Sequence, residues 1–177
     1  MLFCFTYEHF FVYYLKLSYL MIKYKETMVV FAEIPDMISL AINITNCQNN
    51  CKGCHSPELR KNIGKELTDK EIDELIKSNE GINCVVLMGE GKDPERIIEI
   101  SKYIHEKHNL KTAIYSGRET VEPSILNEFD YVKIGPYIEK YGPLNKKTTN
   151  QRLYRIDKKE DGSVLDVVDI TSMFWNK

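Results

Sequence analysis

Three cysteines, Cys47, Cys51 and Cys54, are spaced C-x3-C-x2-C. Thiolates bind iron–sulfur clusters and zinc, and a closed structural site usually takes four protein ligands. No fourth ligand of the same type follows nearby. Three thiolates on a four-iron cluster leave one iron without a protein ligand, so that iron can bind a substrate or cofactor. The spacing therefore predicts a three-cysteine iron–sulfur site that performs chemistry.

Three other interpretations of these cysteines remain open. A zinc site of the Cys3His type would recruit His55, which directly follows Cys54. Adjacent residues rarely both reach one tetrahedral ion, and zinc loops favour paired C-x2-C units. A disulfide framework would leave an odd cysteine, and nothing in the sequence indicates export. Unliganded thiols are the third alternative.

Length and charge limit the classes of protein. The chain has 177 residues, which is the size of one domain but is too short for a complete eight-fold β/α barrel of about 250 residues. Its 24 basic and 26 acidic residues give a net charge of −2. Without a basic excess, we do not expect nucleic acid as a partner.

Residues 1–20 form an apolar leader that is rich in aromatic side chains. The stretch is as long as a membrane span, but three polar or charged residues interrupt it: Glu8, His9 and Lys16. A signal peptide would have a basic start and a small-residue cleavage site. We interpret the leader as an over-extended start, with translation beginning at Met21; an extra packing segment and a membrane anchor are the alternatives. We assign Cys4 no function and expect no membrane partner.

The pattern of apolar residues predicts the elements that hold the cysteines. Residues 38–44 alternate apolar and polar side chains, which predicts a strand that ends just before the cysteines. In α/β folds, sites lie past the carboxyl ends of strands. Capping residues and apolar periodicity predict helices over residues 69–78, 94–108 and 123–127. Short apolar runs predict further strands over residues 84–88, 111–115 and 131–134, and make Cys84 a core residue.

Strands that alternate with helices predict a parallel sheet with right-handed crossovers. The expected fold is α/β: a partial, open β/α barrel with mostly parallel strands. At the carboxyl end of the chain, residues 152–156 and 164–170 flank a polar turn. A terminal hairpin and two edge strands are the alternatives there.

The cysteine motif resembles that of the radical S-adenosylmethionine (SAM) superfamily. Gly53 before the last cysteine and His55 after it narrow the resemblance to the activating proteins of anaerobic ribonucleoside-triphosphate reductase. Residues 134–139 (IGPYIE) and 148–152 (TTNQR) agree with that subset. The resemblance covers residues 21–177, which are therefore expected to form a radical SAM domain.

The resemblance implies a definite reaction. Cys47, Cys51 and Cys54 would hold one 4Fe–4S cluster per chain, and SAM would chelate the fourth iron. Reductive cleavage of SAM would give methionine and a 5′-deoxyadenosyl radical. That radical would take a hydrogen from a glycine Cα on the large subunit of the reductase. A flavodoxin or ferredoxin would supply the electron, in the cytoplasm of an anaerobe.

The resemblance also implies which residues contact SAM. The predicted SAM contacts are Gly53, Cys54, His55, Gly89, Glu90, Gly91 and Ser116. The family has Gly-Gly-Glu or Gly-Gly-Asp where this chain has Gly-Glu-Gly, so Glu90 replaces the second glycine and could offer a carboxylate to the SAM amino group. His55 either tunes the cluster or packs beside it. Ser116 lines the adenosine site or belongs to an ordinary turn.

No protein acid, base or nucleophile is needed, so no catalytic residue is expected beyond the cluster. We expect His105 and His108, near the end of a predicted helix, to be solvated. Asn150, Gln151 and Arg152 either dock the partner's glycine loop or brace the edge of the fold. The alternative functions are an activase of another glycyl-radical enzyme, of the pyruvate formate-lyase type, a radical SAM enzyme acting on a small molecule, and a non-catalytic zinc-binding adaptor.

Overall fold

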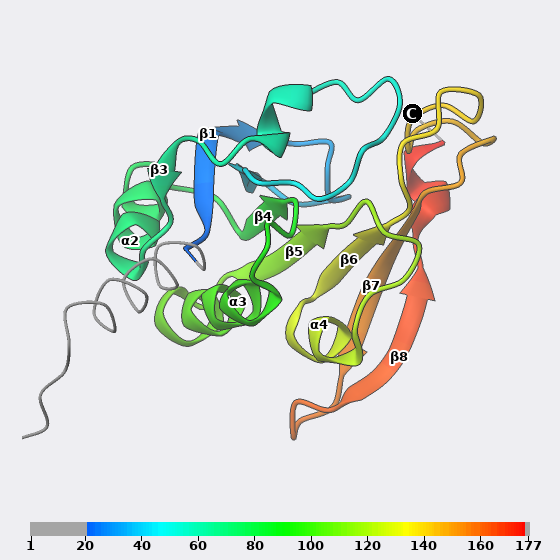
Figure 1. The fold of residues 1–177 in the computed structure, drawn as a ribbon. Coiled ribbons are helices and arrows are strands. Elements are labelled where there is room, and N and C mark those ends of the chain that lie inside the picture. Colours follow the sequence, from blue (N-terminus) through cyan, green and yellow to red (C-terminus); the bar gives the residue numbers. More distant parts are fainter. Residues whose placement is uncertain (1–20, 176–177) are drawn as a thin grey trace, which may run out of the picture.

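Apolar strands in the middle of the chain form the centre of one eight-stranded sheet (Figure 1). The computed structural model describes residues 21–175. The predicted leader, residues 1–20, and Cys4 within it lie outside the described residues. The strands are β1 (Lys23–Val30), β2 (Ser39–Ile44), β3 (Lys65–Glu66), β4 (Cys84–Met88), β5 (Lys111–Tyr115), β6 (Tyr131–Ile134), β7 (Arg152–Lys158) and β8 (Val164–Asp169). Their order in the sheet is β3-β1-β2-β4-β5-β6-β7-β8.

The sheet is mixed, and the prediction of a partial open barrel with mostly parallel strands is wrong. β2, β4, β5 and β6 pair in parallel. The other four of the seven pairings, β1 with β2, β1 with β3, β6 with β7 and β7 with β8, are antiparallel. The physical reason lies in the connections. No α-helix lies between β1 and β2, between β6 and β7, or between β7 and β8. Parallel neighbours need a crossover connection, which is usually a helix.

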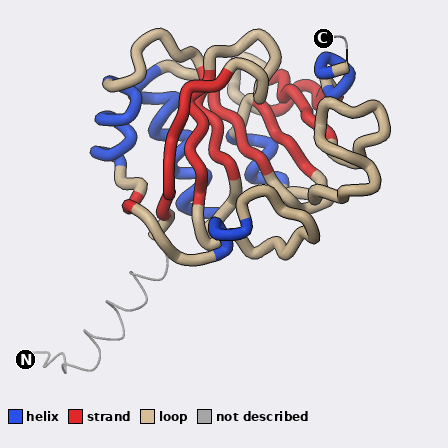
Figure 2. The backbone as a smooth tube through the Cα atoms, turned by 90° about the horizontal axis from the view of Figure 1, so that it is seen from above, coloured by secondary structure: helices blue, strands red, loops and turns tan. Residues whose placement is uncertain are grey.

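Three α-helices cover one face of the sheet within the described residues (Figure 2). They are α2 (Asp69–Lys77), α3 (Pro94–His108) and α4 (Pro123–Glu128), and two short 3₁₀ helices are η1 (Pro57–Arg60) and η2 (Thr171–Phe174). The expected caps are confirmed. Thr68 Oγ1 accepts a hydrogen bond from the Glu71 backbone N–H at 3.2 Å, and Asp93 accepts one from the Arg96 N–H at 3.0 Å. Between residues 21 and 175, no helix has both the length and the apolar character to cross a membrane.

The strands bury both faces, and side chains alternate between two cores. In β4, Val85 and Leu87 pack toward the helices, whereas Cys84 and Val86 pack on the opposite face. Two segments cover that opposite face. One is the connection between β1 and β2, which includes Ile34, and the other is the C-terminal region of the described chain. Cys84 is fully buried, so its prediction as a core residue is confirmed.

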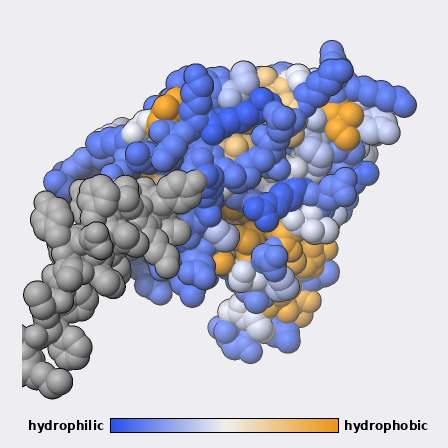
Figure 3. Space-filling view, in the orientation of Figure 1, coloured by the Kyte–Doolittle hydropathy of each residue, from blue (hydrophilic) through white to orange (hydrophobic). Residues whose placement is uncertain are grey.

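The last strand is left partly uncovered. No α-helix follows β6 in the part of the chain that the structure describes, so α4 is the last helix on this face. Leu165 is 64% exposed and Val167 is 39% exposed. Apolar side chains gather in this region, at the lower right of the space-filling view (Figure 3). The two residues mark an apolar surface on an edge strand.

An ionic cluster joins α3 to the start of β5 and β6, at the edge of the sheet opposite the cysteines. His105 Nε2 lies 2.8 Å from Asp130 Oδ2, and its Nδ1 lies 3.2 Å from Glu128 Oε1. Lys111 Nζ donates to the other Asp130 oxygen at 2.8 Å. His108 also pairs with a carboxylate, that of Asp73, at 2.8 Å. Both histidines therefore contact carboxylates, and the expectation that they are solvated is wrong.

The carboxylates and His105 shift one another's protonation. Hydrogen bonds to Asp130 and then to Glu128 raise the pKa of His105 from 6.5 to about 9, although burial opposes the shift. Burial alone would raise the pKa of Asp130, but hydrogen bonds from His105, Lys111 and the Thr112 N–H lower it from 3.8 to about 2. Charged His105 and ionised Asp130 therefore stabilise the folded state at neutral pH.

We predict that stability depends on this pair at both ends of the pH range. The contribution of His105 is complete below pH 6.5 and is lost as the pH rises through 9. The contribution of Asp130 is complete above pH 3.8 and is lost as the pH falls through 2. The test is urea unfolding of wild type and His105→Gln from pH 5 to 10. The difference between their midpoint urea concentrations should become smaller as the pH rises from 6.5 to about 9, the unfolded and folded pKa values of His105. A gap that stays constant with pH would contradict the assignment.

Candidate functional site

The cysteine loop, defined here as residues 46–61, leaves the carboxyl end of β2 (Figure 1). Because β2, β4, β5 and β6 run parallel, their carboxyl ends lie at the same edge of the sheet. Two backbone hydrogen bonds close the base of the loop: Cys47 N–H to Leu59 O and Asn46 N–H to Lys61 O, both 3.0 Å. Arg60 Nη2 donates to the Cys51 carbonyl at 2.8 Å. The predicted position of the cysteines, just past a strand, is confirmed.

The three thiols are free and half-buried. A turn joins the last two, in which the Cys54 N–H donates to the Cys51 carbonyl at 3.3 Å. Gly53 adopts a φ of +74° in that turn, a conformation that suits glycine. Among residues 21–175, no three His, Cys, Asp or Glu side chains are gathered as a ready metal site. The loop thus supplies thiols of the kind that bind iron–sulfur clusters. The three thiols lie on one segment and are accessible, but they are not yet arranged as a coordination sphere.

The segments after β5 and β6 pack against the cysteine loop. The rings of His55 and Tyr137 meet edge to face, with centroids 5.1 Å apart. A Cβ placed on Gly53 would lie 3.6 Å from the Tyr137 ring. At the turn after β5, a Cβ on Gly117 would lie only 2.5 Å from Asn49 Nδ2. The structure therefore brings the cysteine motif and the IGPYIE segment into contact. Neither the spacing of the cysteines nor the periodicity of the apolar residues could predict this contact.

The TTNQR segment braces the chain that follows β6. Asn150 Nδ2 donates to the Pro136 carbonyl at 2.9 Å, and Gln151 Nε2 donates to the Gly135 carbonyl at 3.3 Å. Arg152 Nη1 donates to two nearby backbone carbonyls, at 2.8 and 2.7 Å. These contacts favour the bracing role over partner docking for all three residues. Asn150 Oδ1 is buried and has no hydrogen-bond partner in the structure.

The predicted SAM contacts outside the cysteine loop lie at the same edge, but the two with polar side chains, Glu90 and Ser116, already use them within the protein. Glu90 Oε2 lies 2.8 Å from Arg118 Nε, so the carboxylate proposed for a ligand's amino group forms an ion pair instead. Its neighbours Gly89 and Gly91 have φ of +123° and +60°. Ser116 is buried, and its hydroxyl accepts a hydrogen bond from the Arg118 N–H at 3.0 Å. Ser116 therefore takes part in a turn, which was the alternative to its role in the adenosine site.

Lys133 is a residue that sequence reasoning missed. It lies within β6 and is only 6% exposed. Its Nζ donates to the Gly135 carbonyl at 2.8 Å and stands 5.8 Å from the centre of the Tyr115 ring. Burial lowers its pKa to about 8, while the charge of Cys51 acts in the opposite direction. A single charged residue inside an apolar run was the available signal.

A cavity of about 510 Å³ opens on the face away from the helices. Met88 and Tyr115, the last residues of β4 and β5, line it, together with Glu33, Leu144 and Trp175. The Tyr115 hydroxyl donates to the Glu33 carbonyl and holds one wall. Its size is within the range of small-molecule sites. Tyr115 links this cavity to Lys133.

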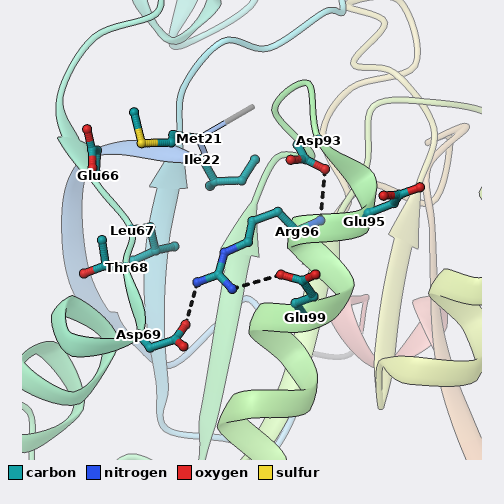
Figure 4. Close-up of a pocket in the computed structure, with 10 residues that line it drawn as sticks. All are labelled: Met21, Ile22, Glu66, Leu67, Thr68, Asp69, Asp93, Glu95, Arg96 and Glu99. Carbon is teal, nitrogen blue, oxygen red and sulfur yellow. Dashed lines mark hydrogen bonds and ion pairs between the residues drawn. The ribbon is translucent and has the colours of Figure 1, made fainter. Parts of the chain in front are cut away.

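A second cavity, of about 390 Å³, surrounds Arg96 beside α2 and α3 (Figure 4). Arg96 forms ion pairs with Asp69 at 2.5 Å and Glu99 at 3.1 Å. Five of the residues that line this cavity are acidic: Glu66, Asp69, Asp93, Glu95 and Glu99. None of the predicted site residues lines either cavity. The first cavity lies at the carboxyl ends of β4 and β5, where ligands of α/β sheets bind, and is therefore the better candidate for a ligand.

Comparison with known proteins assigns no family. No protein-family model matches the sequence, and no match is found among curated proteins or solved structures. The function must therefore be argued from the residues and geometry at the carboxyl edge of the sheet.

We predict that Gly117→Ala displaces the cysteine loop. The added Cβ would lie 2.5 Å from Asn49 Nδ2 and 3.0 Å from its Cγ, so Asn49 must move. Overpacking of this kind costs about 1–3 kcal/mol. Urea unfolding and limited proteolysis of the loop should both show the loss.

The matched control is the double variant Gly117→Ala with Asn49→Ala. A Cβ on Gly117 lies 3.5 Å from the Asn49 Cβ, which is ordinary contact, so truncating Asn49 removes the clash. The double variant should recover most of the stability. If it stays as unstable as the single variant, the close approach of loop and turn is not the cause.

Proposed function

We propose that the protein is a radical SAM activating enzyme that generates a glycyl radical on anaerobic ribonucleoside-triphosphate reductase. The observation that carries the proposal is the meeting of three separate motifs at one edge. The cysteine loop packs on Tyr137 of the IGPYIE segment, and Asn150 of the TTNQR segment holds the neighbouring Pro136. Residues that resemble one family by sequence alone are thus in one contiguous structure.

Cys47, Cys51 and Cys54 would hold the 4Fe–4S cluster. When bound, the cluster supplies the electron that cleaves a carbon–sulfur bond of SAM. The chain's own residues orient and enclose the ligand. Arg60 fixes the backbone at Cys51, and Tyr137 supports the loop at His55. Their task is to hold the reactants in place and to exclude water.

The mixed sheet keeps the feature that the proposal needs. Four parallel strands end at the edge where the cysteine loop begins, and ligands of α/β sheets bind outside carboxyl ends. The cavity of about 510 Å³ is open at the ends of two of these strands, at Met88 and Tyr115. It provides room for a ligand at the ends of these strands.

The partners follow from the proposed reaction. The large reductase subunit would present its glycine to this edge, and a flavodoxin or ferredoxin would deliver the electron. We place the reaction in the cytoplasm of an anaerobe, because a partly exposed cluster on half-buried thiols is open to oxygen.

The experiment is cleavage of SAM by protein that is purified without oxygen, reconstituted with iron and sulfide, and reduced. We expect wild type to form 5′-deoxyadenosine and Cys51→Ala to form none, because the cluster loses a ligand. Cys84→Ala is the matched control, since this fourth cysteine of the described chain is fully buried in β4. It should keep the activity.

The outcomes separate the alternatives. A protein that binds zinc and leaves SAM intact overturns the proposal and favours the adaptor. If SAM is cleaved, electron paramagnetic resonance of mixtures with candidate partners identifies the substrate. A glycyl radical on the reductase subunit supports the proposal, whereas one formed only on a pyruvate formate-lyase type enzyme contradicts it.

A further inference from the structure

Positive charge gathers on two loops at the carboxyl edge of the sheet. The cysteine loop and the loop of residues 137–150 together contain six basic and two acidic residues, which gives them a net charge of +4. The whole chain has a net charge of −2, so the remaining residues carry −6. Charge of one sign that gathers at one place on an otherwise acidic protein directs a partner of opposite charge to that place.

The two loops are in contact, so their charges belong to one surface (Figure 1). A Cβ placed on Gly53 would lie 3.6 Å from the Tyr137 ring and 3.9 Å from the Glu139 carboxylate. Lys52 directly precedes Gly53, and Lys140 directly follows Glu139. Both lysines are exposed. The contact between the loops therefore has a lysine on each side.

The loop of residues 137–150 folds back on itself. The Thr148 hydroxyl donates a hydrogen bond to the Tyr141 carbonyl at 2.7 Å. A Cβ placed on Gly142 would lie 3.0 Å from Lys146 Cγ. The second half of the loop, which carries two of its three lysines, therefore lies against the first half, which carries the third.

The basic surface, as we call it, consists of four lysines on these two loops: Lys52, Lys140, Lys146 and Lys147. All four are exposed, and none forms an ion pair with another residue of the described chain. Lysines elsewhere do pair, such as Lys25 with Glu58 at 3.0 Å. Hydrophilic side chains project at the upper right of the space-filling view, where the two loops lie (Figure 3). The protein thus leaves these charges available to a partner beside the three thiols.

We propose that the basic surface docks the acidic protein that carries the electron to the metal centre of the cysteine loop. The inference rests on the proposed function, in which a flavodoxin or ferredoxin supplies that electron. The carrier loses one electron and the cluster gains it, and no bond forms or breaks at the surface. Because the chain as a whole is acidic, an acidic carrier is repelled at long range unless local positive charge orients it. The same net charge disfavours a nucleic acid as the partner.

Two double variants test the charge of the surface, and a third is the matched control. Lys140→Glu with Lys147→Glu reverses two charges and leaves the cysteine loop unaltered. Lys140→Arg with Lys147→Arg keeps both charges. The control, Lys77→Glu with Lys102→Glu, makes the same change in net charge on α2 and α3. All four lysines are exposed and without an ion pair, so we expect every variant to keep the thermal midpoint of wild type.

The first measurement is the affinity of the anaerobically purified protein for an oxidised flavodoxin, by calorimetric titration. At low salt we expect the Lys140→Glu, Lys147→Glu variant to bind on the order of tenfold more weakly than wild type, whereas the arginine variant and the control stay close to it. The difference should shrink as salt screens the charges.

The second measurement is the rate at which reduced flavodoxin reduces the reconstituted cluster. We expect the Lys140→Glu, Lys147→Glu variant to be reduced on the order of tenfold more slowly than wild type at low salt, and the arginine variant at the rate of wild type. Photoreduced deazariboflavin is a small donor that needs no docking surface. With this donor, SAM cleavage should be the same in all variants.

The outcomes distinguish this inference from the proposed function. If SAM is cleaved, and the Lys140→Glu, Lys147→Glu variant matches wild type toward flavodoxin, the inference is overturned and the function stands. If the protein holds no cluster, the function fails, and the titration still decides whether the surface docks an acidic protein. A control that loses as much affinity as the surface variant shows an effect of net charge alone, and the inference fails. It also fails if the surface variant loses affinity for a DNA oligonucleotide but not for flavodoxin.

Discussion

Parallel pairing of β2, β4, β5 and β6 is the constraint on which the rest of the structure depends. The strands are apolar on both faces, so helices must cover one face and irregular segments the other. Their common direction brings the cysteine loop and the turns after β4, β5 and β6 to one edge. The register has a chemical consequence as well. A slip of β6 by one residue would turn Lys133 toward the helices and an apolar neighbour toward the opposite face.

The central strands and helices could be predicted from the sequence because alternation and capping residues are local signals. Alternation predicted β2, and capping residues predicted the starts of α2 and α3, where Thr68 and Asp93 do cap the first turns. Of the antiparallel strands, β7 and β8 were expected as a terminal hairpin or edge strands, whereas β1 and β3 gave no such signal. β1 exposes Lys25, Glu26, Met28 and Val29 without a regular alternation, and β3 has only two residues. The overall class was wrong for that reason, and not because the middle strands were misread.

The sequence predicted which motifs belong to the candidate site, but not the contacts between them. Sequence spacing placed the three thiols on one loop after a strand, and the structure agrees. It could not show that Glu90 pairs with Arg118, because 28 residues separate them and no pattern couples two strand-end turns. Nor could it decide between docking and bracing for Asn150, which depends on the position of the Pro136 carbonyl. Contacts between loops are set by the sheet beneath them, so they emerge only once the sheet is known.

The cavity beside Tyr115 has an optical consequence. The chain contains one tryptophan, and Trp175 stands in the wall of that cavity with its indole N–H directed to the Leu144 carbonyl at 3.4 Å. Indole emission from the whole protein therefore originates at a single place. The aromatic residues of the leader are phenylalanines and tyrosines, so they add no indole signal. Any molecule that enters the cavity meets a built-in fluorophore, and its arrival can be followed in unlabelled protein.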